Sequence, residues 1–304
     1  MLLRDLGEDG LIQRIRVQFQ DSSVVLGIGD DTAVLDIPNG HSTLFCSDLL
    51  AEDTHFIRGI HPPDSVGYKA VAVNVSDIGA MGGVPMHFAI SFAAPGDLDV
   101  EWVDVFYSGV ARACREFKVT LVGGDSSTAK SIFVDVAMIG RVKAGHAVRR
   151  SGAKQGDSIY VSGNLGGSTR GLDLLRSGIM EDPAVQRHLY PQPRHVYGAW
   201  VGSVAHAMID VSDGLSTDLG HILTESSVSA RIYKDRIPVA SGATVDQALH
   251  GGEEYELIVT LPGVIESAPF TRIGEIIPST GRSQILLVNN GSESVLEPKG
   301  WQHF

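Results

Sequence analysis

The chain has 304 residues, 43% of them hydrophobic and 20% charged, proportions typical of a packed globular protein rather than a disordered one. A formal net charge of −12 argues against nucleic acid or an anionic membrane as a partner attracted by bulk electrostatics. No apolar run reaches the roughly 20 residues that span a bilayer, the first ten residues lack a signal-peptide core, and the two cysteines occupy unrelated contexts, so we expect a reduced, cytoplasmic protein without a membrane partner.

The first predicted elements lead to an acidic turn. Residues 7–20 carry apolar side chains at helical spacing and predict a short helix. Residues 24–35 predict two short strands around a turn that contains Asp30 and Asp31. An ordinary hairpin turn is the alternative to a functional site here.

A second acidic position follows the next strand. Residues 43–48 form a β-type run that ends in Ser47 and Asp48. The polar loop over 52–56 carries His55, and a lone histidine in a loop is commonly a solvated or capping side chain.

Residues 70–83 predict a helix of small side chains that ends in a glycine pair. Its single acidic residue, Asp77, stands among residues that favour burial, and no Lys or Arg lies within one helical turn of it. A buried carboxylate without a positive partner is costly. A metal ion is therefore the natural partner for Asp77.

A third acidic position is expected at a strand end. The strand predicted over 119–122 runs into Gly123, Gly124 and Asp125, and glycines there allow a ligand to approach the backbone closely. The other elements predicted in this part of the chain are a strand over 86–93, an amphipathic helix over 99–117 and a strand over 132–142.

The composition shifts over 145–157, where glycine and basic residues gather, and we place a domain boundary there. The predicted domains are residues 1–144 and residues 145–304. The second half begins with a strand over 158–162, a glycine-rich loop over 163–167 and a helix that starts near Ser168.

The remaining elements mix helices and strands. Residues 180–195 carry Pro and His and predict an irregular segment, and a strand that ends at Asp210 leads into Ser212 and Asp213. Asp213 stands where a helix N-cap would be, so a cap is the alternative to a ligand role. Further strands are predicted over 230–233, 256–261, 271–277 and 284–289, with a short helix over 244–249. Because strands and helices do not alternate strictly, the pattern predicts α+β halves rather than one doubly wound sheet.

The motifs with chemical potential are aspartates flanked by Ser, Thr and Gly. The chain has no Walker-type phosphate loop, no dinucleotide-binding glycine motif and no recognisable Ser-His-Asp or Cys-His signature. Hard oxygen ligands select Mg²⁺ or Mn²⁺ over Zn²⁺. There are more aspartates than one Mg²⁺ needs, so we predict that they converge on several ions around a nucleotide polyphosphate. A set of unrelated caps and turns is the alternative.

An ordered set of motifs resembles the thiamine-monophosphate kinase family, within the superfamily of aminoimidazole ribonucleotide synthetase and selenophosphate synthetase. The resemblance runs from about residue 8 to the end of the chain. It rests on Gly27-Ile28-Gly29-Asp30-Asp31, Ser47-Asp48, His55-Phe56, Asn74-Val75-Ser76-Asp77, Gly123-Gly124-Asp125, Arg150-Ser151-Gly152-Ala153, Asp210-Val211-Ser212-Asp213-Gly214-Leu215, Gly251-Gly252-Glu253-Glu254-Tyr255-Glu256-Leu257 and the ending Lys299-Gly300-Trp301-Gln302-His303-Phe304.

The resemblance implies a role for each matching residue. The implied magnesium ligands are Asp30, Ser47, Asp48, Asp77, Asp125, Asp210 and Asp213, among which Asp30, Asp48, Asp77, Asp125 and Asp210 would form the catalytic set. The implied ATP contacts are Tyr107, Gly124, Asp125, Arg150 and Ser212. The implied contacts to thiamine monophosphate are His55, Glu253 and Trp301.

The resemblance also implies an architecture and a reaction. It implies two α+β domains: the first would bind ATP and Mg²⁺ and pair with a second copy across a shared sheet or barrel, and the second would complete the site. The implied reaction is in-line transfer of the γ-phosphoryl group of ATP to thiamine monophosphate on several Mg²⁺ ions. The alternatives are a superfamily synthetase that cyclises a purine precursor and a non-catalytic nucleotide-binding protein.

Overall fold

The computed structural model describes residues 14–15, 17–19, 38–264 and 269–301. The predicted helix over 7–20 lies largely outside these ranges, and the predicted turn with Asp30 lies entirely outside them. The chain divides into two compact units: the first comprises Met1–Ile78 and Gly83–Gly145, and the second comprises Gly79–Gly82 and His146–Phe304.

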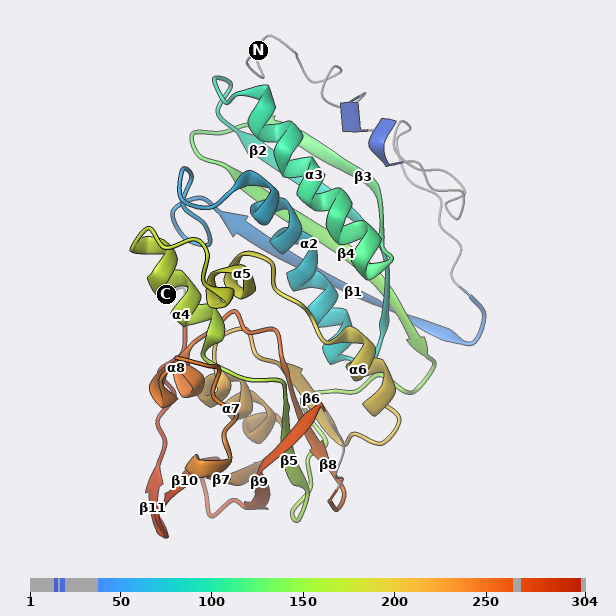
Figure 1. Ribbon diagram of the computed structural model, residues 1–304. Helices are drawn as coiled ribbons and strands as arrows, with labels where there is room; N and C mark the ends of the chain where they lie inside the picture. The colour runs from blue at the N-terminus through green and yellow to red at the C-terminus, as the bar shows by residue number, and fades with distance from the viewer. Residues whose placement is uncertain (1–13, 16, 20–37, 265–268, 302–304) are drawn as a thin grey trace. The chain divides into compact units, whose positions relative to one another are not determined.

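The first unit is a four-stranded sheet with two helices on one face (Figure 1). The strand order is β1-β4-β2-β3; β4 is antiparallel to both of its neighbours, and β2 and β3 are parallel. Its elements are β1 (His41–Ala51), α2 (Pro63–Ala80), β2 (Val84–Ala94), α3 (Val100–Phe117), β3 (Thr120–Thr128) and β4 (Phe133–Lys143).

Side chains alternate across this sheet, as the two-residue period of a strand requires. On β4, Val134, Val136 and Met138 are fully buried against the helices, whereas Phe133 on the opposite face is 38% exposed. Helix α3 begins where the side chain of Asp99 accepts a hydrogen bond from the backbone N–H of Glu101. The sheet therefore has one covered face and one open face.

Strand β3 is longer than predicted. The sequence pattern ends it at Val122, but pairing with β2 continues through Gly123, Gly124 and Asp125 to Thr128. A parallel neighbour that supplies backbone hydrogen bonds outweighs the low strand propensity of a glycine pair. Asp125 consequently lies within a strand and not in a loop after it.

The second unit is a seven-stranded sheet in the order β11-β10-β7-β9-β5-β8-β6. It is antiparallel throughout except for the parallel pair β10 and β7. Its strands are β5 (Ser158–Ser162), β6 (Ala207–Asp210), β7 (Val228–Tyr233), β8 (Leu257–Leu261), β9 (Phe270–Pro278), β10 (Ile285–Asn289) and β11 (Ser292–Val295). Its helices are α4 (Gly167–Arg176), α5 (Pro183–Leu189), α6 (His195–Val201), α7 (Leu215–Ser226), the 3₁₀ turn η1 (Lys234–Arg236) and α8 (Val245–His250).

The central strands of the second unit are buried on both faces. Ile159 and Val161 of β5 belong to one hydrophobic cluster with α7 and α8, and Tyr160 between them belongs to another cluster that includes Val201 of α6. Alternate residues of one strand thus enter two cores. Such strands read as continuous apolar runs, as 158–162 does.

The segment predicted to be irregular over 180–195 contains a helix and the start of another. Helix α5 begins at Pro183, and the side chain of Asp182 accepts a hydrogen bond from the N–H of Ala184. Val185 and Leu189 are buried with Leu175 of α4. The prediction was wrong because an Asp-Pro pair is also a start signal for a helix.

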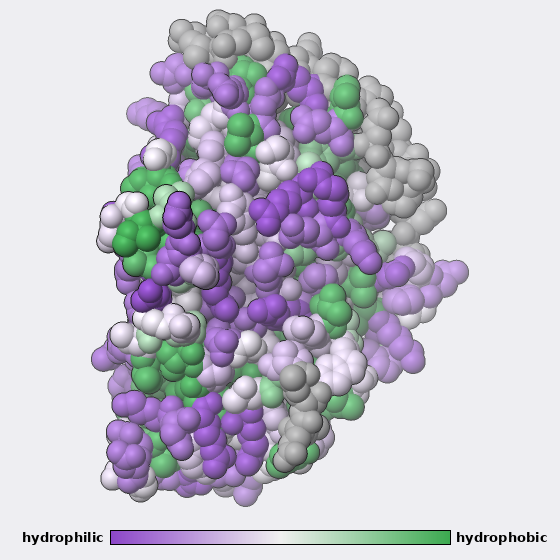
Figure 2. All heavy atoms as spheres, viewed as in Figure 1, coloured by the Kyte–Doolittle hydropathy of each residue, from purple (hydrophilic) through white to green (hydrophobic). Residues whose placement is uncertain are grey.

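The helices and the visible surface carry little continuous apolar character. Among the described residues, no helix combines the length and the apolar character that a bilayer span needs. Figure 2 shows hydrophilic side chains spread over the visible face, with apolar side chains in small groups between them.

Candidate functional site

Three segments that are far apart in the sequence meet in the second unit. The loop after β6 carries Ser212 and Asp213, the segment before β8 carries Glu253, and the last described residue is Trp301. The N–H of Glu253 donates to the carbonyl of Ser212 at 2.7 Å, and the N–H of Trp301 donates to the carbonyl of Asp213 at 3.1 Å. The structure therefore brings together four residues singled out from the sequence.

Two glycines permit this close approach. A Cβ at Gly252 would lie 2.4 Å from the carbonyl oxygen of Ser212, and a Cβ at Gly300 would lie 2.2 Å from that of Asp213. Both contacts are to backbone, which has little room to shift, so a side chain at either position would separate the segments. This requirement explains the glycine in each of the two motifs.

The loop after β6 is held by a carboxylate that the sequence motifs do not include. Asp218, in the first turn of α7, accepts hydrogen bonds from the N–H groups of Asp213 and Gly214 at 3.1 and 3.0 Å. The N-cap of α7 is Gly214, which has no capping side chain. The alternative interpretation of Asp213 as the cap is therefore wrong, and its side chain is left for another role.

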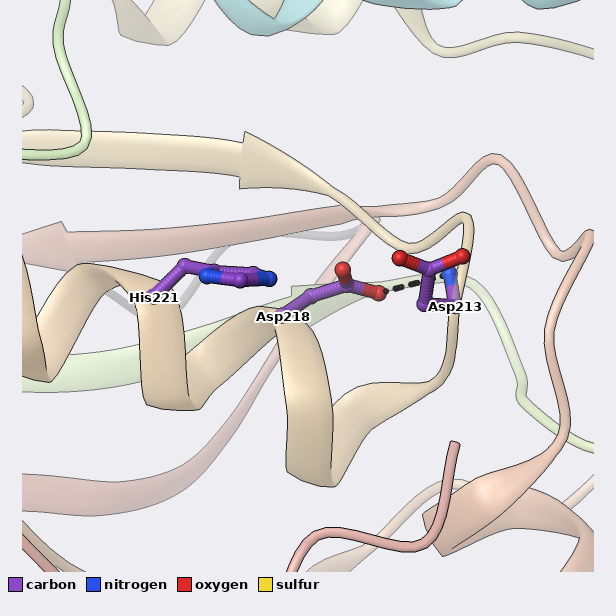
Figure 3. A group of neighbouring side chains, drawn as sticks. All are labelled: Asp213, Asp218 and His221. Carbon is purple, nitrogen blue, oxygen red and sulfur yellow. Dashed lines mark hydrogen bonds between the residues drawn. The ribbon is translucent and has the colours of Figure 1, made fainter. Parts of the chain in front are cut away.

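Asp213, Asp218 and His221 form a compact group (Figure 3). One possible metal-ligand atom from each of the three side chains lies within 4.8 Å of the other two. Among the described residues, no other group of three Asp, Glu, His or Cys side chains was found that meets this criterion. Burial, with the charges of Asp210 and Asp213 as smaller causes, raises the pKa of Asp218 to about 8. The sequence contained a signal for this group, because Asp218 and His221 are three residues apart and so lie on the same side of one helix, just after the acidic loop.

The two residues of this unit for which the resemblance implies contact with thiamine monophosphate, Glu253 and Trp301, are partly exposed. The side chain of Glu253 is 27% exposed, and its Oε2 lies 3.5 Å from Nδ1 of His188. Trp301 is 51% exposed. An indole and a carboxylate on neighbouring segments are the groups that suit a flat organic cation.

In the first unit, Ser47 and Asp48 lie on opposite faces of the sheet. The Oγ of Ser47 donates to Asp135 Oδ1 at 2.7 Å on the open face. Asp48 follows Cys46 on the covered face, where the Cys46 Sγ lies 3.5 Å from Oδ1 of Asn74 in α2. Adjacent residues of one strand cannot point the same way, so the two predicted ligands are not side by side.

Two further predicted residues of the first unit lie in α2 and in the loop before it. Asp77 is half-buried in the last turn of α2, three residues after Asn74. The loop before α2 folds back so that Nδ1 of His55 accepts a hydrogen bond from the N–H of Ala51 at 3.0 Å. In the neutral ring the proton is then on Nε2, which makes His55 a donor rather than a base at that nitrogen.

Two predicted ATP contacts differ in exposure. Tyr107 is 3% exposed, with its ring edge-on to Phe19 and Phe106, and burial raises the pKa of its phenol well above the usual value. Gly124 lies in the exposed part of β3, where a Cβ would lie 2.1 Å from the carbonyl of Ile90. Tyr107 is thus a core residue in the single chain, and Gly124 allows close pairing of two strands.

Asp125 does not meet Asp48 within one copy of the sheet. Asp125 pairs with Ser91, which pairs with Asp135, and these residues share the open face. β3 and β1 are the two edge strands, so about 14 Å of sheet separates them at the usual strand spacing. The expectation that all the acids converge within one chain is therefore not met for this pair.

Arg150 lies at the other end of α7 from Ser212. The Oγ of Ser226, the last residue of α7, donates to the carbonyl of Arg150 and accepts from the N–H groups of Gly152 and Ala153. The 12 residues of α7 span about 18 Å. Arg150 is exposed, so a ligand that touched both residues would have to be extended.

Comparison with known proteins gives a consistent result. Residues 29–142 match the model of the family described as AIR synthase related protein, N-terminal domain. A thiamine-monophosphate kinase of Aquifex aeolicus (strain VF5) is 37% identical, with both chains fully covered. The protein of that name from Bacillus subtilis (strain 168) is 35% identical over 93% of this chain and 94% of its own.

Solved structures share the fold. The structure described as AaThiL complexed with AMPPCP and TMP has a TM-score of 0.80 and 37% identity, and covers 100% of this chain and 99% of its own. Thiamine-monophosphate kinase from Stenotrophomonas maltophilia K279a gives a TM-score of 0.82 at 31% identity, over 93% and 96% of the two chains. Hydrogenase maturation protein HypE in complex with ATP has the same fold, with a TM-score of 0.81 at 21% identity over 98% of each chain.

Proposed function

Because this chain belongs to the thiamine-monophosphate kinase family, we propose that it transfers the γ-phosphoryl group of ATP to the phosphate of thiamine monophosphate, producing thiamine diphosphate and ADP. Its two-unit α+β fold is the one found in AaThiL. The observation that carries the proposal is the meeting of Glu253 and Trp301 on the loop with Ser212 and Asp213. An indole and a carboxylate would bind the cationic thiazolium ring beside the phosphoryl-transfer machinery.

The acceptor requires little activation by the protein. The second pKa of a phosphate monoester is about 6, so thiamine monophosphate is mostly dianionic at pH 7. The barrier comes from bringing two anions together, since two unit charges 4 Å apart repel by about 4 kcal/mol at an effective dielectric near 20. A site rich in acids that hold cations suits this reaction, which needs no histidine base. In the proposal His55, whose Nδ1 accepts from Ala51, contacts the substrate as a donor through Nε2.

Magnesium fits the residues present. Asp210, Asp213 and Asp218 gather carboxylate oxygens, and the pKa of Asp218 is raised mainly by burial and further by the charges of Asp210 and Asp213, which a bound cation would offset. In the first unit, Asp48 and Asp77 supply the same donor type. Bound Mg²⁺ would neutralise phosphate charge and hold the reacting oxygens in line.

The proposed assembly is a homodimer. The open sheet face exposes apolar side chains that a soluble monomer rarely leaves together: Phe45 at 70%, Leu49 at 47%, Val84 at 46% and Phe133 at 38%. Pairing two such faces would also set the edge strand that carries Asp125 of one copy near a second copy.

Transfer of labelled γ-phosphate tests the reaction. Purified protein with γ-labelled ATP and thiamine monophosphate should form labelled thiamine diphosphate in the presence of Mg²⁺ and none after chelation. Omission of thiamine monophosphate should stop ADP release. ADP release that continues without it, or turnover with formylglycinamidine ribotide in its place, contradicts the proposal.

A further inference from the structure

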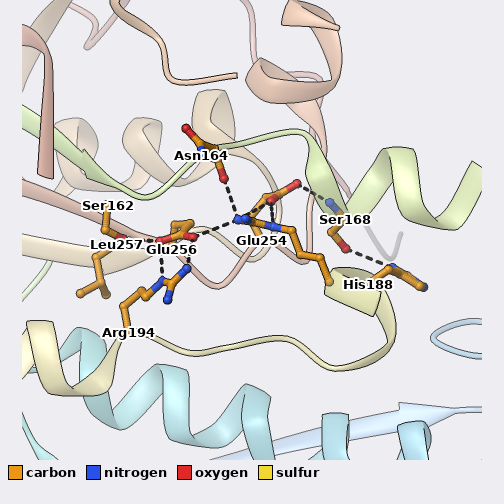
Figure 4. Close-up of polar contacts among 9 residues, drawn as sticks. Ser162, Asn164, Ser168, His188, Arg194, Glu254, Glu256 and Leu257 are labelled. Carbon is orange, nitrogen blue, oxygen red and sulfur yellow. Dashed lines mark hydrogen bonds and ion pairs between the residues drawn. The ribbon is translucent and has the colours of Figure 1, made fainter. Parts of the chain in front are cut away.

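Two arginines bind the buried carboxylates of Glu254 and Glu256 in a network of ion pairs (Figure 4), directly after Glu253 in the chain. Arg187 of α5 donates from Nε to Glu254 Oε2 at 3.0 Å and from Nη2 to Glu256 Oε1 at 2.9 Å. The next residue of the helix, His188, faces Glu253 at 3.5 Å. One helix therefore places cationic or imidazole groups opposite all three acids of the Glu253–Glu256 segment.

Glu256 is bound by a second arginine. Its side chain is 1% exposed, and Arg194, which precedes α6, donates to its two oxygens from Nε and Nη2 at 2.8 Å each. The hydroxyl of Ser162 adds a third donor at 2.6 Å. A buried carboxylate that loses its cationic partner is left as an uncompensated charge, which is costly. The paired hydrogen bonds between Arg194 and Glu256 therefore fix the relative position of the two side chains.

The glycine-rich loop over 163–167 makes room for the network. A Cβ at Gly163 would lie 2.2 Å from Glu256 Oε1, and a Cβ at Gly167 would lie 2.7 Å from the Cδ of Arg187. The carbonyl of Asn164 accepts a hydrogen bond from Arg187 Nη2 at 2.6 Å. These glycines therefore enclose ions of the protein itself, and the N–H of Ser168 that follows them binds Glu254 Oε1 at 2.9 Å.

The backbone between the acids is strained. Glu253 and Tyr255 have φ angles of 61° and 52°, in the left-handed region that side chains other than glycine seldom adopt. With positive φ at every second residue, the side chain of Glu253 is 27% exposed, whereas those of Glu254 and Glu256 are 0% and 1% exposed. Such a conformation persists only where the surroundings impose it.

We propose that Arg187 and Arg194 are positioning residues for the thiamine end of the substrate. By holding Glu254 and Glu256 inside, they keep the backbone in the conformation that presents the side chain of Glu253 at the surface. The inference rests on the proposed function, in which Glu253 contacts thiamine monophosphate. It assigns to helix α5 and to the residue before α6 a role in substrate recognition without contact with the substrate.

The variants Arg187→Lys and Arg194→Lys test this role, because lysine keeps the charge but loses the two-pronged contact. We expect the KM for thiamine monophosphate to rise about tenfold in each variant while the KM for ATP stays within about twofold. The matched control is Arg231→Lys, since Arg231 of β7 pairs with Glu275 of β9 and Glu293 of β11 and its side chain is similarly exposed, at 32%. Equal effects on both substrates, or no effect in the folded variants, would overturn the proposal.

Hydrogen exchange without substrate gives a second readout. In Arg194→Lys we expect faster exchange at the N–H groups of Glu253 and Tyr255, which donate to Ser212 and Val211, with β6 and β8 unchanged. Loss of protection throughout the seven-stranded sheet overturns the proposal, because the network would then support the whole unit. A wild-type protein inactive on thiamine monophosphate contradicts the proposed function alone, since exchange tests the positioning independently.

Discussion

At the scale of single residues, Asp77 stands where helix electrostatics disfavour it. It lies in the last turn of α2, at the negative end of the helix, and that turn contains no basic residue. A carboxylate there costs about 0.3–1 kcal/mol unless a cation is near. The proposed role of Asp77 as a magnesium ligand would offset that cost, since a bound cation would lie near the carboxylate.

Replacement of Asp77 by asparagine separates these explanations. Asp77→Asn should reduce ADP release at least about 100-fold, because a ligand for the phosphate-bound cations is lost. The free energy of unfolding should change by less than about 1 kcal/mol, since the removed charge opposes the helix dipole. Kinetic assays and urea unfolding measure the two effects, and parallel losses in both would make Asp77 structural.

Glu254 gives a prediction about pH. Burial is the main cause that raises its pKa from 4.5 to about 7, against the opposing effect of Arg187. The folded state therefore holds a proton that the unfolded state releases, so stability falls as pH rises from about 4.5 to about 7, by on the order of 3 kcal/mol in all. Glu254→Gln should flatten that part of the stability curve in urea titrations. A variant with the wild-type slope would exclude Glu254 as its source.

At the scale of elements, periodicity and start signals recovered most of the fold. Helix α3 matches the predicted 99–117, and α8 follows Thr244, whose side chain forms a capping box with Gln247. The failures lie where local signals conflict with tertiary pairing. The glycine pair before Asp125 indicated a strand end, but β2 extends the strand, and α5 is too short for periodicity to show.

The Asp182 cap gives a direct test of the start of α5. Asp182→Ala should lower the free energy of unfolding by about 1 kcal/mol, because the N–H of Ala184 loses its acceptor. Asp246→Ala, at an 86% exposed side chain in the first turn of α8, is the control and should change stability less. Equal effects in urea unfolding would mean that the Asp182 cap contributes little.

The candidate site was predictable only in part for the same reason. Motifs identified Ser212, Asp213, Glu253 and Trp301, and the fold brings them together. The residues that hold them in place were not recognised, because a partner such as Asp218 or Arg187 is defined by the fold and not by its sequence neighbours. Sequence motifs identify residues with a chemical role, whereas the residues that hold them in position are identified only by contacts between segments distant in the sequence.

At the scale of the whole molecule, the open face of the four-stranded sheet determines the expected assembly. Phe45→Glu should shift the protein from dimer to monomer and reduce activity, because a charge would enter an apolar interface. Val295→Glu, at an exposed valine of the other unit, is the control and should leave the protein dimeric. Sedimentation at micromolar concentration measures both, and a monomeric wild-type protein contradicts the proposed dimer.

The hydrogen bonds that attach Gly300 and Trp301 have a practical consequence. Gly300 and Trp301 are attached to the rest of their unit by hydrogen bonds to Thr217 and Asp213. Carboxypeptidase digestion past Gly300 would remove Trp301 and leave every strand of the seven-stranded sheet in place. Under the proposed function, a clipped sample would keep its melting temperature but lose affinity for thiamine monophosphate, so the intact mass of a purified sample should be measured before that sample is considered inactive.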